Sequence, residues 1–362
     1  GGAGNDTITI IGVDAAETVE GGAGDDTLVG TGMSNGTIYN LAAGTVTLGA
    51  SVQVATSFLN VTGSSANETL IGNGAGNVLD GGIGNDTING GGGGDVIFGG
   101  DGDDQLSGQV GDDTMTGGAG NDTYFVNSAG DVVDEGAGLG IADMVRSSVT
   151  FNLISAGGEI ENLTLLDGAA INGTGNALAN RIVGNTSVNT INGGSGNDAL
   201  LGGGSADSVS GGNNDDDLVG GGGDDDMAGG SGNDNLFGGA NNDDLFGGVG
   251  NDRVYGGTQN DTVTASDGSD VLFGGAGADT LTGGAGNDRL YGGTGAVDLF
   301  IFASGFDDDV LIDFDVGLDT IRIVGGFNSG DVTLTTVGAH VRATLTTGDT
   351  LLIQNVTVAE VS

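Results

Sequence analysis

The chain contains no cysteine, proline, tryptophan or lysine. The absence of cysteine excludes disulfides and thiolate metal sites, and the absence of lysine excludes a P-loop. The sequence has no apolar run of about 18 residues, so we expect no segment that spans a membrane. Its six basic residues are scattered arginines, which excludes the clustered positive charge that nucleic acids and anionic membrane surfaces attract.

Glycine and acidic residues dominate what is present. The 362 residues include 81 glycines and 50 acidic residues, and the net charge is −44. This much glycine without a Gly-X-Y period or proline excludes collagen, and a hydrophobic content of 36% is too high for a disordered linker. The composition therefore favours a repeat protein whose natural ligands are cations.

A nine-residue repeat accounts for most of the chain. Seven nonapeptides follow one another without a gap over 63–125, among them GGIGNDTIN (81–89), and thirteen more follow over 175–291. In the second block the sixth position is aspartate eleven times in succession, and the eighth position is then always apolar. The apolar residues are Leu200, Val209, Leu218, Met227, Leu236, Leu245, Val254, Val263, Leu272, Leu281 and Leu290.

The spacing predicts a short strand and a turn in each nonapeptide. Positions seven to nine form a minimal strand with one inward apolar side chain, and positions one to six form the turn. Glycines at positions one, two and four supply the positive φ angles of that turn. Two nonapeptides make one coil, and coils stack about 4.7–4.9 Å apart, so that aspartates 18 residues apart lie above one another. The predicted fold class is all-β, a parallel β-roll or β-solenoid.

Stacked aspartates require a cation. Two carboxylates about 4.8 Å apart repel each other by roughly 3.5 kcal/mol at an effective dielectric constant of about 20. Zinc needs cysteine or histidine ligands, and the one histidine, His340, lies outside the repeats. Magnesium demands a strict octahedron, whereas Ca²⁺ accepts six to eight oxygens from carboxylates and backbone carbonyls. The ladder therefore predicts calcium as its ligand.

The pattern GGxGxDxUx resembles the nonapeptide of RTX (haemolysin-type) calcium-binding proteins. The resemblance implies that the carbonyls of positions one and three and the carboxylate of position six bind calcium between neighbouring coils, about a dozen ions in all. It assigns to calcium the carbonyls of Gly229, Ser231, Gly238, Ala240, Gly247 and Val249, and the carboxylates of Asp26, Asp86, Asp95, Asp104, Asp113, Asp122, Asp198, Asp207, Asp216, Asp225, Asp234, Asp243, Asp252, Asp261, Asp270, Asp279 and Asp288.

The period fails in several segments, which we predict to be metal-free. Turns with Asn67, Asn77, Asn180 or Asn189 near the aspartate position are expected to be structural. The predicted sections are an irregular N-terminal part (1–62) with longer strands over 30–62, the first repeat block (63–125), a metal-free solenoid spacer (126–174), the second block (175–296) and a C-terminal β cap (297–362).

The C-terminal segment carries the expectations about location. FDDDVLIDFDVGLDTIRI (306–323) resembles the C-terminal region of RTX proteins exported by type I secretion, whose uncleaved signal lies in the last residues. The resemblance implies a secreted, extracellular or cell-surface protein with the type I secretion apparatus as a partner.

Three roles remain open. The first is a non-enzymatic structural or surface protein of the adhesin or S-layer kind. The second is the secretion and folding module of a larger protease, lipase or pore-forming toxin, because the opening GGAGNDTIT already lies inside a repeat and suggests a fragment. The third is a filament or lattice formed by end-to-end pairing of copies.

One motif and one residue resemble parts of catalytic sites, and we assign a catalytic role to neither. GMSNG (32–36) fits G-x-S-x-G, but no strand-turn-helix context surrounds it, and the match is expected by chance in so glycine-rich a chain. His340 is expected to be a strand residue that faces solvent. The aromatic residues at position nine, Phe237, Phe246, Tyr255 and Tyr291, are expected to pack along the outer face rather than to bind sugars.

Overall fold

The computed structural model describes residues 2–11, 18–31, 37–41, 45–48, 51–56, 58–136, 140–157, 159–303, 305–325 and 332–357. It divides into two compact units, Gly1–Ala169 (unit 1) and Ala170–Ser362 (unit 2). Among these residues the secondary structure is β-strand except for one short 3-10 helix, η1 (Leu153–Ser155). None of the described segments forms a helix that is long and apolar enough to cross a membrane. The all-β prediction is confirmed.

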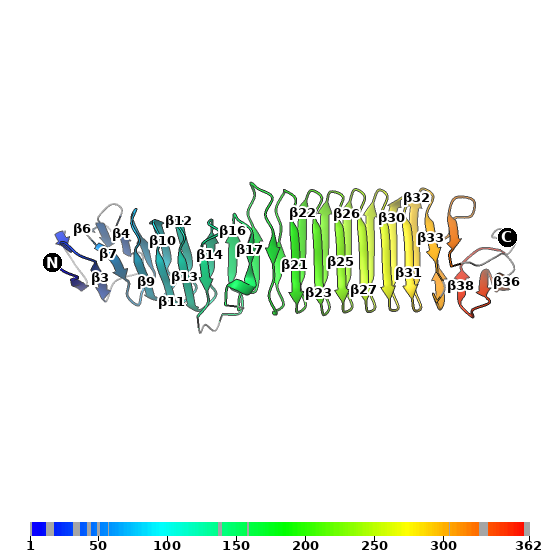
Figure 1. Cartoon of the computed structure of the whole chain (residues 1–362), viewed down its shortest axis with the longest axis horizontal. Coiled ribbons are helices and arrows are strands. Elements are labelled where there is room, and N and C mark those ends of the chain that lie inside the picture. The colour runs from blue at the N-terminus through cyan, green and yellow to red at the C-terminus, as the bar shows by residue number, and fades with distance from the viewer. Residues whose placement is uncertain are drawn as a thin grey trace. The chain divides into compact units, whose positions relative to one another are not determined.

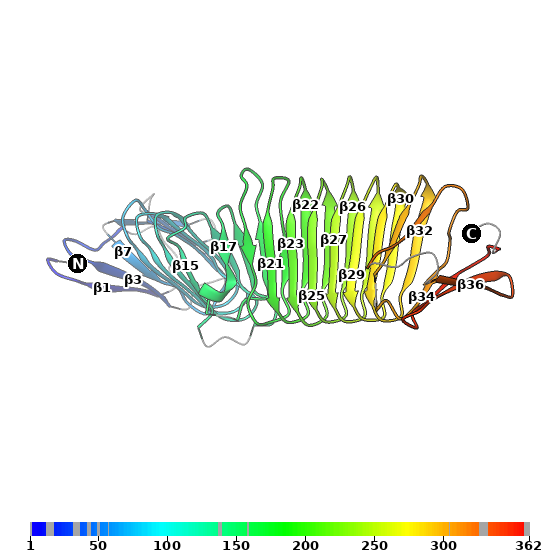
Figure 2. The ribbon, with the colours of Figure 1, turned by 45° about the vertical axis from the view of Figure 1, so that its right-hand side comes forward.

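Unit 2 is a parallel β-roll in which strands alternate between two sheets (Figures 1 and 2). Strand pairing joins residues 18 positions apart, such as Leu236 with Val254, so two nonapeptides make one coil as predicted. One sheet contains β19 (Gly173–Thr174), β21 (Thr190–Ser195), β23 (Ser208–Asn213), β25 (Asp226–Ser231), β27 (Asp244–Val249), β29 (Thr262–Asp267), β31 (Thr280–Ala285), β33 (Leu299–Phe302) and β35 (Thr320–Ile323). The other contains β20 (Arg181–Val183), β22 (Ala199–Gly204), β24 (Asp217–Gly222), β26 (Asn235–Ala240), β28 (Arg253–Thr258), β30 (Val271–Gly277), β32 (Arg289–Gly295) and β34 (Asp308–Leu311).

The strands of the regular coils are longer than the sequence predicted. β25 and β26 run from position seven of one nonapeptide to position three of the next, and only positions four to six remain as the turn. Glycine at positions two and four has a positive φ, as at Gly230 (114°) and Gly232 (141°). Position one does not, so that part of the prediction is wrong. Its glycine serves a different purpose, which the metal site explains below.

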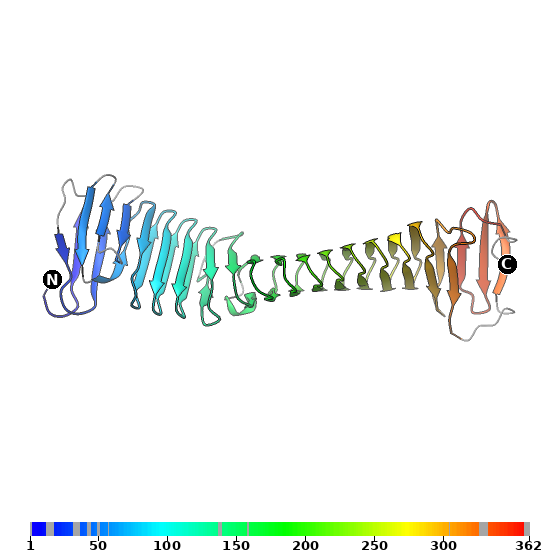
Figure 3. The same ribbon diagram turned by 90° about the horizontal axis from the view of Figure 1, so that it is seen from above.

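The core of unit 2 is a narrow column of aliphatic side chains from position eight. From Leu200 to Leu290 these side chains are 0–2% exposed, and Figure 3 shows the coils that carry them from above. The outer face carries a ladder of stacked rings, in which neighbouring centroids of Phe237, Tyr255, Phe273 and Tyr291 lie 4.5–4.7 Å apart. The predicted packing of these aromatic residues is therefore confirmed. Phe246 lies in the other sheet and remains 45% exposed.

At the C-terminal end of unit 2, antiparallel pairing follows the parallel stack. β38 (Thr350–Ile353) pairs in parallel with β34, and β37 (His340–Leu345) pairs antiparallel with both β38 and β36 (Val332–Val337). His340 opens β37, is half-buried, and accepts a hydrogen bond on Nδ1 from the Asn355 amide (2.9 Å). Residues 358–362, at the end of the predicted secretion signal, lie outside the described residues.

Unit 1 is also a roll of two parallel sheets. The first contains β1 (Thr7–Ile11), β3 (Asp26–Thr31), β7 (Phe58–Thr62), β9 (Val78–Ile83), β11 (Val96–Asp101), β13 (Thr114–Ala119) and β15 (Val132–Asp134). The second contains β8 (Glu68–Ile71), β10 (Thr87–Gly92), β12 (Gln105–Val110), β14 (Thr123–Val126), β16 (Met144–Ser147) and β18 (Asn162–Leu165). β16 and β18 belong to the predicted spacer and continue the parallel pairing; β17 (Phe151–Asn152) lies between them in the chain.

The N-terminal part of unit 1 departs from the roll. β4 (Thr37–Asn40), β5 (Thr45–Leu48) and β6 (Ser51–Thr56) form an antiparallel meander, and β2 (Thr18–Glu20) pairs in parallel with β6. Within 30–62 the described strands β4, β5, β6 and β7 have four to six residues, no more than the six residues of a strand such as β25 in the regular coils. The GMSNG motif (32–36) lies outside the described residues.

Candidate metal site

The position-six aspartates occupy the turns between strands and face the interior of the roll. Asp234 immediately precedes β26 and is 1% exposed, and Asp252 immediately precedes β28 and is also 1% exposed. The left-handed turn at Gly232 reverses the chain just before Asp234. A residue type that is almost never buried without a partner is thus buried in every regular coil.

One carboxylate oxygen of each aspartate joins neighbouring coils. Asp234 Oδ1 accepts a hydrogen bond from the Asp216 amide (2.8 Å), and Asp252 Oδ1 accepts one from the Asp234 amide (2.8 Å). In unit 1, Asp104 Oδ1 accepts from the Asp86 amide (2.7 Å) in the same way. These bonds hold each carboxylate in a fixed orientation, which predefines the position of its second oxygen.

That second oxygen has no protein partner. Burying a carboxylate oxygen without a hydrogen bond costs free energy. A bound cation would offset this cost, because it would be the partner that the protein atoms do not provide. Among the described residues, the aspartates with a buried, unpartnered Oδ2 are Asp26, Asp86, Asp95, Asp104, Asp113, Asp122, Asp198, Asp207, Asp216, Asp225, Asp234, Asp243, Asp252, Asp261, Asp270, Asp279, Asp288 and Asp309. Every aspartate assigned from the sequence is in this set.

Carbonyl oxygens converge on the same place, and position-one glycine makes room for them. A Cβ added to Gly229 would lie under 3.0 Å from both Asp234 Oδ2 and the carbonyl oxygen of Gly247 in the next coil. Gly238 stands in the same relation to Asp243 Oδ2 and to the next position-one carbonyl. A carboxylate and a carbonyl held around one point suit Ca²⁺, which binds oxygens at about 2.3–2.6 Å.

The position-three carbonyls are tied into the stack. The carbonyl of Val249 accepts a hydrogen bond from the Gly232 amide (2.9 Å), and that of Ala240 accepts one from the Gly223 amide (3.2 Å). A carbonyl oxygen has a second lone pair, so these bonds leave it able to bind an ion. The equivalent residue Ser231 lies in β25, opposite Val249 in β27.

Burial makes the charged form of these aspartates unfavourable. It raises the pKa of Asp234, Asp216 and Asp270 to about 7, against an ordinary value of 3.8. The hydrogen bond from the neighbouring coil lowers the pKa of each carboxyl, and the charges of aspartates in adjacent coils raise it again. At neutral pH the ladder therefore needs either protons or metal ions to offset its charge.

Asparagine at position six removes this need. Asn189 Oδ1 accepts a hydrogen bond from the Asn185 amide (2.8 Å) within its own turn, and its Nδ2 donates to the carbonyl of Ile171 (2.5 Å). Asn77 bonds in the same way to the Asn73 amide and the carbonyl of Leu59. Both side-chain atoms are satisfied by protein, which supports the prediction that these turns are structural.

The ladder extends beyond the residues that the sequence analysis identified. Asp131 and Asp143 accept from the amides of Asp113 and Asp122, beyond the first block. In unit 2, Asp298, Asp309 and Asp319 accept from the amides of Asp279, Asp288 and Asp298. Their spacing is 19 or 21 residues in four of these five cases, so a search at a period of nine misses them.

Fold and site together define a calcium-binding parallel β-roll. The family described as "RTX calcium-binding nonapeptide repeat (4 copies)" matches more than half of the chain, and the chain belongs to that family. The matched segments are residues 11–32, 62–97, 90–124, 98–133, 174–209, 196–227, 228–263 and 264–297.

The comparisons with solved structures and with curated proteins give less information about this chain. A similar solved structure is described as "Crystal structure of extracellular lipase LipA from Serratia marcescens", with 15% sequence identity and a TM-score of 0.21. The match covers 61% of this chain and 44% of the lipase chain. A comparison with curated proteins found no match.

Replacing Gly229 with alanine should disturb one calcium site. Because the new Cβ would lie under 3.0 Å from both Asp234 Oδ2 and the Gly247 carbonyl, we expect a destabilisation of about 1–3 kcal/mol and weaker calcium binding. Gly222→Ala is the matched control, since Gly222 has no atom within 4 Å of its added Cβ and needs no positive φ. Urea unfolding at saturating calcium measures the stability of both variants. Equal stability of the two variants would contradict the assigned role of position one.

Proposed function

We propose that this chain is an extracellular protein whose rolls fold when they bind calcium, and that its role is structural or at the cell surface rather than catalytic. The observation that carries the proposal is the ladder of buried aspartates with one oxygen bonded to the next coil and the other without a partner. Calcium binding is the established property of the repeat family to which the chain belongs. The location and the structural role go beyond it.

The ladder gives this proposal a mechanism. Where calcium is scarce, as in a cytosol, the buried carboxylates repel one another and the stacked coils are unfavourable. The chain then stays unfolded, which suits export through a type I secretion channel. Where calcium is millimolar, each bound ion adds its binding free energy to folding, because the site exists only when two coils are stacked. Calcium acts as the trigger of folding and not as cargo.

The positions of the acidic side chains support a structural role. The inward aspartates of both units belong to the ladder, and the aliphatic column fills the space between the sheets. The outer face presents further acids such as Asp226 and Asp244, which are exposed and lie opposite each other in neighbouring strands. The proposal therefore assigns the chemistry of the roll to calcium and not to a substrate.

The test removes the charge of two ladder side chains and leaves each of them able to form hydrogen bonds. In the variant Asp234→Asn/Asp252→Asn, each amide can adopt the arrangement of Asn77 and Asn189, so the coils should remain stacked at millimolar calcium. We expect about one to two fewer bound calcium ions per chain by equilibrium dialysis.

The matched control is Asp226→Asn/Asp244→Asn, which removes the same charge from two exposed residues that are also 18 positions apart. It should bind as many ions as the unmodified chain. If both double variants lose the same number of ions, calcium is held by general surface charge and the proposed ladder is wrong.

A further inference from the structure

The end of the first repeat block contains an acidic side chain where the repeat has glycine. Asp122 is the sixth residue of the last nonapeptide in the block, and the segment that follows is irregular. β13 pairs with β15 so that Thr116 lies opposite Asp134, which places Gly117 opposite Glu135. The Gly118 amide donates to the carbonyl of Glu135 (3.3 Å), consistent with this register. Glu135 therefore takes the place of the position-one glycine of the next coil.

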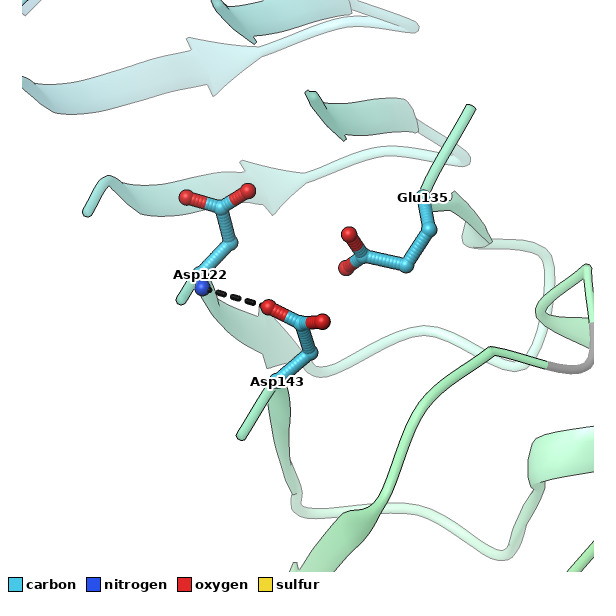
Figure 4. A group of neighbouring side chains, drawn as sticks. All are labelled: Asp122, Glu135 and Asp143. Carbon is cyan, nitrogen blue, oxygen red and sulfur yellow. Dashed lines mark hydrogen bonds between the residues drawn. The ribbon is translucent and has the colours of Figure 1, made fainter. Parts of the chain in front are cut away.

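The side chain of Glu135 points into the roll, toward Asp122 and Asp143 (Figure 4). It is 2% exposed, and its Oε1 accepts a hydrogen bond from the hydroxyl of Tyr124 (2.5 Å). Its Oε2 is buried without a partner, as is Asp122 Oδ2. Asp143 is 1% exposed and accepts a hydrogen bond on Oδ1 from the Asp122 amide (2.7 Å).

The three carboxylates are close enough to share one ion. One oxygen from each of Asp122, Glu135 and Asp143 lies within 4.8 Å of the other two. Oxygens bound to one Ca²⁺ at about 2.3–2.6 Å are separated by at most roughly twice that distance, so no large movement is needed. The Tyr124 hydroxyl adds a fourth oxygen, since both it and Asp122 Oδ2 lie under 3.0 Å from the point where a Cβ of Gly117 would stand.

We propose that Asp122, Glu135 and Asp143 form a further calcium site, distinct from the nonapeptide sites because a glutamate stands where the repeat has the position-one glycine and adds its carboxylate to the ligands. The set consists only of oxygens, which excludes a zinc preference, and its three carboxylates favour a cation of high charge. In this site the last position-six aspartate of the first block binds an ion, although no further nonapeptide follows it directly. The segment 126–174, predicted to be metal-free, then contributes two of the three ligands.

Terbium luminescence can report on this site, because Tb³⁺ substitutes for Ca²⁺ and is sensitised by a nearby tyrosine. Of the four tyrosines, Tyr124 is the one hydrogen-bonded to Glu135. In the full chain, excitation of tyrosine should give terbium emission that calcium displaces and that magnesium at the same concentration does not. The Tyr124→Phe variant should lose this component while keeping the emission that other tyrosines sensitise.

The substitution Glu135→Gln preserves size and can still accept the Tyr124 hydrogen bond, but it removes one ligand charge. We expect the Tyr124-dependent emission to need roughly tenfold or more terbium to reach half its maximum. Glu20→Gln makes the same chemical change at an exposed residue of unit 1 and should leave the midpoint unchanged. Equal circular dichroism at millimolar calcium shows that the variants fold.

Two outcomes would overturn the proposal. The first is equal emission from the unmodified chain and Tyr124→Phe, which would mean that Glu135 is a protonated partner of Tyr124 with no ion beside it. The second is the same midpoint for Glu135→Gln and Glu20→Gln. The regular coils of unit 2 are tested separately, because failure of the calcium sites there would appear as unchanged ion counts in the Asp234→Asn/Asp252→Asn variant.

Discussion

At pH 7.5 in excess EGTA, the chain should lose most of its β-sheet circular dichroism, and millimolar calcium should restore it. The reason lies in the repeated turn. Each regular coil buries a carboxylate such as Asp234, whose Oδ2 has no protein partner, and stacks it next to an identical one from the adjacent coil. Without calcium, each adjacent pair contributes a repulsion of roughly 3.5 kcal/mol at an effective dielectric constant of about 20.

The expected effect is large because the contributions add along the stack. At a free calcium concentration ten times the dissociation constant, one site contributes about 1.4 kcal/mol. The dozen or so sites predicted from the sequence would together contribute about 17 kcal/mol, which exceeds the typical total stability of a domain, about 5–15 kcal/mol. The aliphatic column supplies one buried side chain per nonapeptide, and this is too little to offset the loss.

The control is magnesium at the same ionic strength, which screens charge equally well but demands a strict octahedron and should not restore the signal. Small-angle X-ray scattering on the same samples should show a larger radius of gyration in EGTA. If the chain is equally compact and equally rich in β-structure in EGTA and in calcium, calcium does not control folding.

The periodic part of this fold can be predicted from the sequence because two residue types carry it. An apolar residue at position eight and aspartate at position six recur from Asp198 to Leu290, and the spacing alone implies coils of 18 residues. The structure confirms parallel pairing at that spacing, as between Asp226 and Asp244. A pattern that repeats in sequence repeats in space, so each coil supports the interpretation of the next.

The length of the strands could not be predicted in the same way. Positions one to three, such as Gly229 to Ser231, are strand residues in the structure, yet two of them are glycines that carry no strand signal. Their extended pairing depends on the coil above and below and not on local preference. Glycine at position one is required by contact with Asp234 Oδ2 and the next carbonyl, and the sequence cannot show such a contact.

The ends of the ladder were missed for a geometric reason. Between Asp122 and Asp143, and between Asp288 and Asp309, three residues are added to the coil, yet the amide-to-carboxylate bond is kept. The ladder continues across the added residues. Glu135 gave no signal at all, because its role follows from the register of β13 and β15 rather than from any motif.

Acid should partly replace calcium. In EGTA, lowering the pH from 7.5 to 5 should increase the β-sheet signal of the chain, because the buried aspartates take up protons when the metal-free roll forms. Burial raises the pKa of Asp216, Asp234 and Asp261 to about 7, and that of Asp198 and Asp243 to about 6, whereas an unfolded aspartate titrates near 3.8.

The direction follows from proton linkage. Between about pH 4 and pH 7 the folded, metal-free roll binds more protons than the unfolded chain, so its stability falls as the pH rises. The contribution of these carboxyls is fully present below the unfolded pKa and is lost as the pH rises through the folded pKa values of about 6 to 7. Each pKa unit corresponds to about 1.4 kcal/mol per group, so a ladder of such groups gives a steep dependence.

Calcium should weaken this dependence, since an ion and a proton compete for the same oxygen of Asp234 or Asp252. The calcium concentration at the folding midpoint should fall as the pH falls from 7.5 to 5.5, because protons already stabilise the metal-free roll. Calcium binding to the folded roll near pH 6 should release more protons than binding at pH 8. Titration calorimetry in two buffers of different ionisation enthalpy counts these protons. A midpoint that does not change with pH, or an apo chain that is more folded at pH 8 than at pH 5, would show that the buried carboxylates are not the groups that calcium neutralises.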